Sequence, residues 1–66
     1  VGIGINALFK NTTKSNLVAV GDSALFNNGL GATGIQATGN TAIGSKTLYS
    51  NTIGNFNTAN GYETLF

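Results

Sequence analysis

A short motif that recurs four times constrains this chain more than any other feature of its sequence. The motif reads small residue, apolar residue, glycine, two variable positions, small residue, leucine and aromatic residue. Its copies are GIGINALF at residues 2–9, AVGDSALF at 19–26, AIGSKTLY at 42–49 and ANGYETLF at 59–66. The chain is therefore a repeat array that occupies a single domain, residues 1–66.

The glycines of the four copies are Gly4, Gly21, Gly44 and Gly61, so the intervals are 17, 23 and 17 residues. Repeats built from paired helices need about 33 residues or more, whereas this period suits one coil of a β-solenoid. We predict an all-β fold, a parallel β-roll of four coils around these glycines with one six-residue insertion. Both chain ends fall inside a repeat, which suggests a segment of a longer fibre or a stacking subunit.

The residues before each glycine are expected to form a short strand, with alternate side chains facing the coil interior. After the glycine, leucine and an aromatic residue are adjacent, which means either a strand with two buried faces or a single helical turn. We favour the strand, with leucine inside and the aromatic row packed against a neighbouring chain. The predicted coil core is Ile3, Leu8, Val18, Val20, Leu25, Ile43, Leu48 and Leu65. The predicted assembly interface is Phe9, Phe26, Tyr49 and Phe66.

Asparagine recurs three residues after the leucine, at Asn11, Asn28 and Asn51. Asparagine side chains bond their own backbone in turns, and stacked copies form amide ladders, so we predict both roles here. Asn11-Thr12-Thr13 is also a glycosylation sequon, but the turn role already explains this asparagine.

The inserted residues form a glycine-rich loop at about positions 29–39. Loops carry binding specificity more often than scaffolds do, so this loop is the expected place for a ligand contact. A mere spacer is the alternative interpretation. The candidate polar contributors are Thr33, Gln36, Thr38 and Asn40.

Composition excludes several function classes. The chain has no cysteine and no histidine, so neither a disulfide framework nor a zinc or haem site is expected, and we predict no cofactor. Charged residues make up only 8%, which leaves no electrostatic footprint for nucleic acid. No apolar run approaches the roughly 20 residues of a membrane span, and no signal peptide is visible.

Motifs that could carry chemistry have simpler explanations. Gly29, Gly31 and Gly34 match a dinucleotide fingerprint, but the required flanking strand, helix and acidic residue are missing. Asp22 and Glu63 are the only carboxylates and belong to different repeats, without histidine or cysteine as base or nucleophile. Threonines do not recur in the T-x-T rank of ice-binding solenoids. We therefore predict that the chain is not an enzyme.

The stretch NTAIG at residues 40–44 resembles the N-x-A-[IV]-G repeat in head domains of trimeric autotransporter adhesins. The longer NTAIGSKTLYSNTIG at residues 40–54 resembles repeats of bacterial and phage tail-fibre-type proteins. These resemblances imply a left-handed parallel β-roll, three chains around an axis, an extracellular or cell-surface location, and adhesive or structural work. A further resemblance, to leucine-rich repeats with an I-G-x-x-A-F turn, implies a helical segment after the glycine.

We therefore expect a structural or adhesive segment of an extracellular fibre that binds copies of itself, as a homotrimer or a filament, through aromatic rows and coil ends. The alternative is a carbohydrate-binding module at a fibre tip. In that case Phe56, Tyr62 and the inserted loop would contact the sugar. A host glycan or host surface would be the partner in that case.

Overall fold

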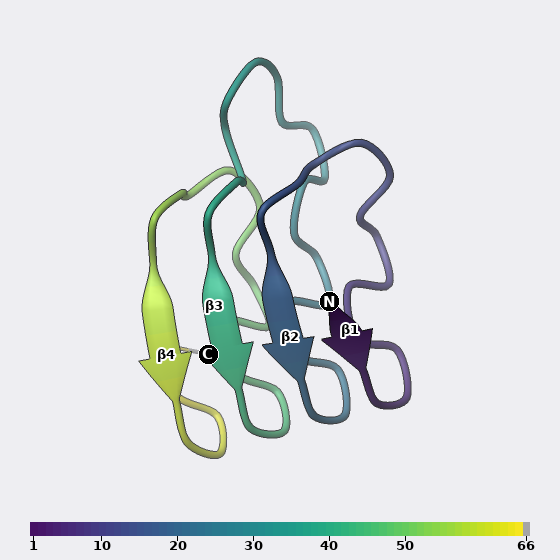
Figure 1. Ribbon diagram of the computed structural model, residues 1–66, viewed down its shortest axis with the longest axis vertical. Coiled ribbons are helices and arrows are strands. Elements are labelled where there is room, and N and C mark those ends of the chain that lie inside the picture. The colour runs from purple at the N-terminus through teal and green to yellow at the C-terminus, as the bar shows by residue number, and fades with distance from the viewer. Residues whose placement is uncertain (66) are drawn as a thin grey trace.

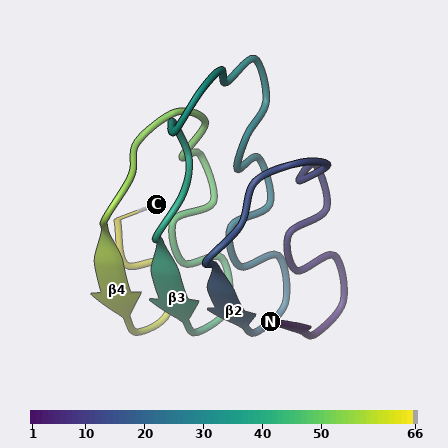
Figure 2. The same cartoon turned by 45° about the horizontal axis from the view of Figure 1, so that its top comes forward.

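The computed structural model describes residues 1–65 and shows an all-β chain with four short strands and, in that range, no helix. The strands are β1 (Gly2–Ile3), β2 (Val18–Val20), β3 (Thr41–Ile43) and β4 (Thr58–Asn60). They form one parallel sheet in the order β1-β2-β3-β4 (Figure 1). After each of the first three strands the chain makes a narrow loop, passes behind the sheet and returns to start the next strand (Figures 1 and 2).

Equivalent positions of the sequence repeat lie side by side in the sheet. Val18 pairs with Thr41 and Thr41 pairs with Thr58, which are shifts of 23 and 17 residues. Gly2 pairs with Ala19, again 17 residues apart. The pairing therefore follows the glycine spacing of the sequence, and this parallel arrangement is compatible with a repeat-like β structure.

The strand face that points into the molecule is the alanine row. Ala19 and Ala42 are fully buried and Ala59 is 4% exposed, whereas Ile3 is 58% and Ile43 41% exposed. The buried apolar cluster consists of Leu17, Ala19, Ala24, Leu25, Ala42, Leu48 and Ala59.

The predicted inward row of Ile3, Val18, Val20 and Ile43 is therefore wrong. Val18 and Val20 are half-buried and belong, like the two isoleucines, to the outer face. Alternation gives two apolar faces in these strands, so hydrophobicity alone could not choose between them. The deciding factor is size, since leucine side chains from the connections fill the narrow interior and leave room for alanine only.

The leucines that follow the glycines occupy different depths. Leu25 and Leu48 lie in the buried cluster, and Leu8 is partly buried against it. Leu65 is 60% exposed, so its predicted core position is wrong. Leu25 and Leu48 have a neighbouring connection on each side, whereas Leu8 and Leu65 lie at the two ends of the sheet and have one on a single side only.

The segment after each glycine is neither a strand nor a helical turn, so both predicted alternatives are wrong. We call residues 4–9, 21–26, 44–49 and 61–65 the turn segments. In each of them two residues other than glycine have left-handed backbone angles, for example Ser23 with φ 61° and Leu25 with φ 52°. An L-residue loses about 1–2 kcal/mol in this conformation. The angles change sign from residue to residue, which produces a zigzag of short turns with leucine inside and the aromatic ring outside.

Hydrogen bonds between neighbouring turn segments offset that strain. The Leu25 N–H donates to the Thr47 C=O at 2.9 Å, and the Leu48 N–H donates to the Thr64 C=O at 3.0 Å. Close packing also fixes the residue that starts the segment. A Cβ added at Gly21 would lie 2.6 Å from the carbonyl carbon of Gly44, and its φ of 133° is itself unfavourable for other residues.

Candidate functional site

The aromatic residues that end the turn segments form a stack along the side of the molecule. The ring centroids of Phe9 and Phe26 are 5.0 Å apart with planes 14° from parallel. Phe26 and Tyr49 are also 5.0 Å apart, with an interplanar angle of 13°. This distance follows the spacing of about 4.8 Å between paired strands, because each ring occupies the same position of its repeat. Three of the four predicted interface residues thus lie together, and Phe66 lies outside the described residues.

The faces of the stacked rings are covered by one another rather than open to a partner. Phe9, at the β1 end, is 58% exposed, while Phe26 and Tyr49 are half-buried. The Lys10 ammonium lies 5.7 Å from the Phe9 ring centroid. A molecule that approaches the rings of Phe9, Phe26 and Tyr49 from the side meets ring edges.

Asparagine side chains form a buried amide network beside the returning connections. The Asn28 Oδ1 accepts hydrogen bonds from the Nδ2 atoms of Asn51 at 2.9 Å and Asn40 at 3.0 Å. The Asn28 Nδ2 donates to the Ala37 C=O at 2.9 Å. The Asn51 Nδ2 also donates to the Gly54 C=O at 3.0 Å, which is the expected turn bond. Asn51 therefore makes both a turn bond and a ladder bond, whereas the Asn28 side chain bonds the two other asparagines and the inserted loop but not its own turn.

Asn40 belongs to this network and not to a ligand site. It is fully buried, its Nδ2 also donates to the Gly54 C=O at 2.8 Å, and its Oδ1 accepts the Asn57 backbone N–H at 3.0 Å. Its amide is thus engaged inside the fold, so the prediction that Asn40 contacts a ligand is wrong. Only the tertiary fold brings Asn40 beside Asn28, so the sequence alone could not assign this role.

The ladder stops between Asn11 and Asn28. The Asn11 Nδ2 donates to the Lys14 C=O at 3.1 Å, but its buried Oδ1 has no hydrogen-bond partner among residues 1–65. The insertion explains this interruption. The Ala37 C=O of the inserted loop accepts the hydrogen bond of the Asn28 Nδ2, so this donor is not directed at the Asn11 Oδ1. The sequon asparagine is half-buried, and its Nδ2 makes the turn bond.

The inserted loop projects beyond the other connections (Figures 1 and 2) and is attached to both of its neighbours. The Lys14 Nζ donates to the Gly34 C=O at 2.6 Å, and the Phe56 N–H donates to the Thr38 C=O at 3.0 Å. The Gln36 side chain accepts the Thr33 N–H at 3.0 Å.

Three of the four candidate ligand residues in this loop have polar groups engaged by the loop itself. The Thr38 hydroxyl donates to the Ile35 C=O at 2.6 Å, and the Thr33 N–H and Gln36 side chain bond each other. Ile35 is 72% and Leu30 53% exposed. The exposed part of the loop is therefore more apolar than its sequence of threonine, glutamine and asparagine suggests.

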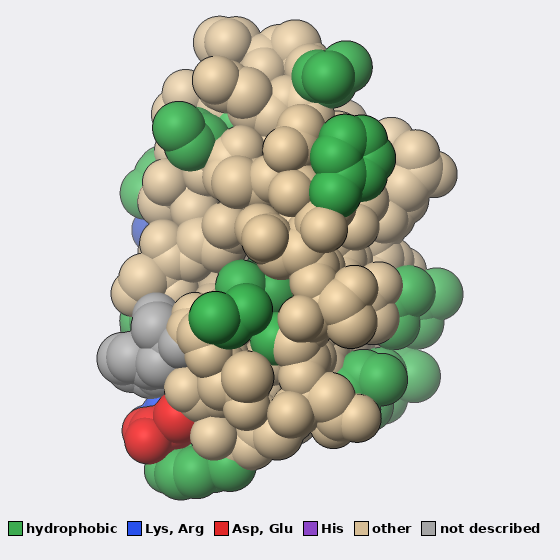
Figure 3. All heavy atoms as spheres, turned by 90° about the vertical axis from the view of Figure 1, so that its left-hand side faces the viewer, with side chains coloured by type: hydrophobic (Ala, Val, Ile, Leu, Met, Phe, Trp, Pro, Cys, Tyr) green, Lys and Arg blue, Asp and Glu red, His purple; other side chains and the backbone are tan. Residues whose placement is uncertain are grey.

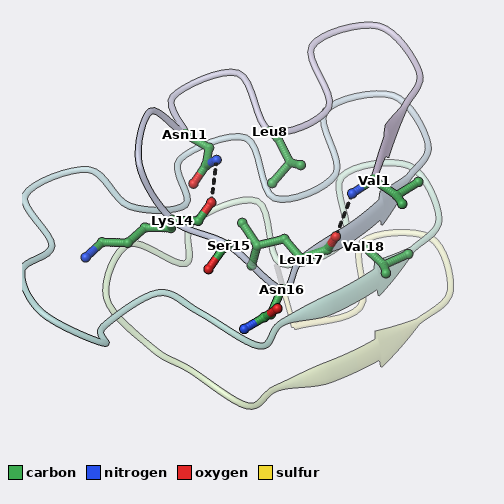
Figure 4. A pocket seen from close by; sticks show the side chains of 8 residues that line it. All are labelled: Val1, Leu8, Asn11, Lys14, Ser15, Asn16, Leu17 and Val18. Carbon is green, nitrogen blue, oxygen red and sulfur yellow. Dashed lines mark hydrogen bonds between the residues drawn. The ribbon is translucent and has the colours of Figure 1, made fainter.

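A pocket of about 490 Å³ lies beside the connection between β1 and β2, which we call the first connection, at the edge of the sheet formed by β1 (Figure 4). Leu8 and Leu17 supply apolar walls, and Asn11 and Lys14 lie on the polar side. The Val1 ammonium donates to the Leu17 C=O at 2.7 Å, and both residues line the pocket (Figure 4). The sequence did not indicate this pocket, which is lined by residues of the first repeat and of the connection to β2.

Charges are sparse and dispersed. Within residues 1–65, no group of three or more acidic, histidine or cysteine side chains is placed to hold a metal ion. In the same range, no helix has the length and apolarity of a membrane span. Comparison of the chain with protein-family models, with curated proteins and with solved structures gave no match.

Proposed function

We propose that the chain is a structural segment of an extracellular or cell-surface fibre that binds copies of itself and catalyses no reaction. In this proposal the fold is a β-solenoid of four coils with a 17-residue period and a six-residue insertion after the second turn segment. The observation that supports this proposal most directly is the parallel pairing of equivalent repeat positions, Val18 with Thr41 and Thr41 with Thr58. Such stacking can continue from chain to chain, which is how fibres are built.

Self-association is favoured by the amount of apolar surface that a single copy leaves exposed. The outer sheet face carries Ile3 and Ile43, and the aromatic stack exposes the ring edges of Phe26 and Tyr49. Completing the burial of an aromatic side chain contributes at most about 2 kcal/mol. A sister chain against the aromatic row would stabilise a thin fold whose own core consists mainly of alanine and leucine.

The test is the association state of the purified chain. Sedimentation equilibrium from micromolar to millimolar concentration should give a mass that rises above 6.7 kDa. Phe9→Ser removes the most exposed ring of the stack and should weaken association if the aromatic row is an interface. Phe56→Ser is the matched control, because Phe56 is 74% exposed but lies outside the stack. A 6.7 kDa monomer throughout this range would refute the proposal.

A carbohydrate-binding tip is the second candidate function. Two exposed rings favour it, since Phe56 and Tyr62 are 74% and 68% exposed and open ring faces stack on sugars. Glycan-array binding that Tyr62→Ala and Phe56→Ala abolish, while Phe9→Ala preserves it, would support this function over a purely structural one. Binding that none of these variants changes would contradict it.

A further inference from the structure

We propose that copies of this chain stack head to tail, with the β1 end of one copy seated on the β4 end of the next. The contact surfaces are residues 1–9 of one copy and residues 58–65 of the other. This inference rests on the proposed function and specifies its partner and orientation. β1 and β4 are the two edges of the sheet, and parallel edges readily accept a further strand.

Inside the molecule, hydrogen bonds between turn segments follow one fixed rule. Two residues after each glycine, the N–H points back to the preceding segment. Thus the Ser23 N–H donates to the Ile5 C=O at 2.8 Å, and the Lys46 N–H donates to the Asp22 C=O at 2.8 Å. The donor lies on the later segment in each case.

Four residues after each glycine the direction is reversed. The Leu8 N–H donates forward to the Ala24 C=O at 3.0 Å, and the Leu25 N–H donates forward to the Thr47 C=O at 2.9 Å. Each segment therefore presents a different pattern of donors and acceptors on its two sides, and the pattern on one side is complementary to that on the other.

The two ends of the molecule retain the unpaired halves of this pattern. At the β1 end, the Asn6 N–H and the Ala7 C=O have no hydrogen-bond partner within residues 1–65. At the β4 end, the same is true of the Tyr62 C=O and the Leu65 N–H within the described range. Continuing the internal rule across two copies pairs the Asn6 N–H with the Tyr62 C=O and the Leu65 N–H with the Ala7 C=O.

The apolar surfaces of the two ends are complementary as well. The pocket at the β1 end is walled by Leu8, which is only partly buried, and by Leu17 (Figure 4). At the β4 end Leu65 is 60% exposed. In the proposed stack Leu65 of one copy packs against Leu8 of the next copy. This contact repeats the packing of Leu8, Leu25 and Leu48 within one molecule. The β4 end shows separate hydrophobic groups on a surface that is largely uncharged apart from one acidic patch (Figure 3).

The orientation follows from the polarity of the hydrogen bonds. Each end presents one donor and one acceptor, and the β1 end placed on the β4 end continues the parallel pairing found between the turn segments inside the molecule. Two β1 ends would meet in an antiparallel arrangement, which does not continue this pairing. The contact of a β1 end with a β4 end joins two different surfaces, and when it continues the stacking direction of the sheet it yields an open-ended stack.

Single-cysteine variants test this orientation, because the chain contains no natural cysteine. Asn6 and Glu63 are exposed and occupy the same repeat position as Ser23, so a side chain of the size of cysteine already occurs in this left-handed conformation. In the proposed stack their Cα atoms lie at a strand spacing of about 4.8 Å, within the range of about 4.4–6.8 Å that a disulfide spans.

Mild oxidation of an equimolar mixture of Asn6→Cys and Glu63→Cys should give a disulfide heterodimer at least tenfold more abundant than either homodimer. Thr33→Cys, an exposed position in the inserted loop, replaces Asn6→Cys as the control and should give no such excess. Self-association without the Asn6–Glu63 crosslink, or homodimers in equal amount, would overturn the head-to-tail contact but leave the proposed function standing. A monomer at every concentration would overturn both.

A second variant pair tests the leucine contact. Leu65→Asp should reduce the association constant at least tenfold, because a carboxylate would be buried against Leu8. Leu30→Asp places the same charge on an exposed leucine of the inserted loop and should leave association within twofold of the parent chain. Circular dichroism should show that both variants stay folded, since both leucines are more than half exposed. Equal effects of the two substitutions would contradict the proposed contact.

Discussion

The Oδ1 atom of Asn28 accepts a hydrogen bond from the Nδ2 atom of Asn51 at 2.9 Å, although the two residues are 23 positions apart in the chain. Asn28 is fully buried, and the same oxygen also binds Asn40. The Asn28 amide thus links its own connection, between β2 and β3, to the connection between β3 and β4 and to the inserted loop. The interior of this chain is held by side-chain hydrogen bonds as well as by its small apolar core.

Asn28→Ala should destabilise the fold strongly. The substitution would leave the Ala37 carbonyl and two asparagine Nδ2 groups without one of their partners, and a buried group left unsatisfied costs about 1–3 kcal/mol. Urea unfolding of the monomer should show a total loss of about 3 kcal/mol. Asn55→Ala is the control, because its Nδ2 reaches the Ile35 carbonyl at 3.4 Å on the surface, and it should change stability by less than about 0.5 kcal/mol. Similar losses in the two variants would contradict a central role for Asn28.

The reassigned strand face predicts opposite responses to substitutions of neighbouring residues. Ala42→Val adds volume inside a filled interior and should cost about 1–3 kcal/mol. Thr41→Val, next to it on the outer face, should be neutral within about 0.5 kcal/mol. Thermal unfolding followed by circular dichroism measures both. An Ala42→Val chain as stable as the parent would mean that the alanine row is not tightly packed.

Leu25→Ala should be among the most damaging substitutions, since this side chain is fully buried and its removal leaves a cavity. Losses for such changes are about 2–5 kcal/mol, enough to unfold a small domain. Leu30→Ala, at a leucine that is 53% exposed, should cost less than about 1 kcal/mol. The comparison can be made by urea unfolding, and comparable losses would count against the core described above.

Alanine in place of glycine separates crowding from backbone strain. Gly21 and Gly31 both have positive φ, but a Cβ would be 2.6 Å from Gly44 at the first position and would meet nothing within 4 Å at the second. Gly31→Ala should therefore cost only about 1 kcal/mol for its backbone conformation. Gly21→Ala should cost at least twice as much and shift the amide resonances of residues 44–46 in NMR spectra. Equal stability of the two variants would refute the crowding argument.

The sequence predicted the strand before each glycine and its side-by-side pairing, because the glycine period places equivalent residues next to one another. It did not predict the turn segment after the glycine, where its pattern favours a strand. It did not predict which strand face is buried, since Ala42 and its neighbour Ile43 are both apolar and only the width of the interior selects alanine. The backbone of Leu25 was also beyond local reasoning. Its left-handed conformation is unfavourable for leucine and is held by a hydrogen bond to Thr47, which comes from another repeat.

The candidate site shows the same division. The aromatic row of Phe9, Phe26 and Tyr49 followed directly from the repeat, because equal positions stack at the strand spacing. The role of Asn40 did not, since its partners Asn28 and Gly54 belong to other repeats and meet it only through the inserted loop. Features that recur in the sequence could be predicted, and those created by the insertion could not.

The interruption of the amide ladder beside Asn11 gives the molecule a weak end. From Asn28 onward the connections are linked by asparagine bonds inside the fold. The first connection, between β1 and β2, is linked to the inserted loop by the exposed Lys14–Gly34 bond instead, and it covers Leu8 only in part. Under a pulling force, or during thermal fraying, residues 1–17 should detach first while the remainder stays closed. Hydrogen exchange would then be fastest at the amides of the first connection, and in a stack each junction between copies would be the point at which the fibre yields.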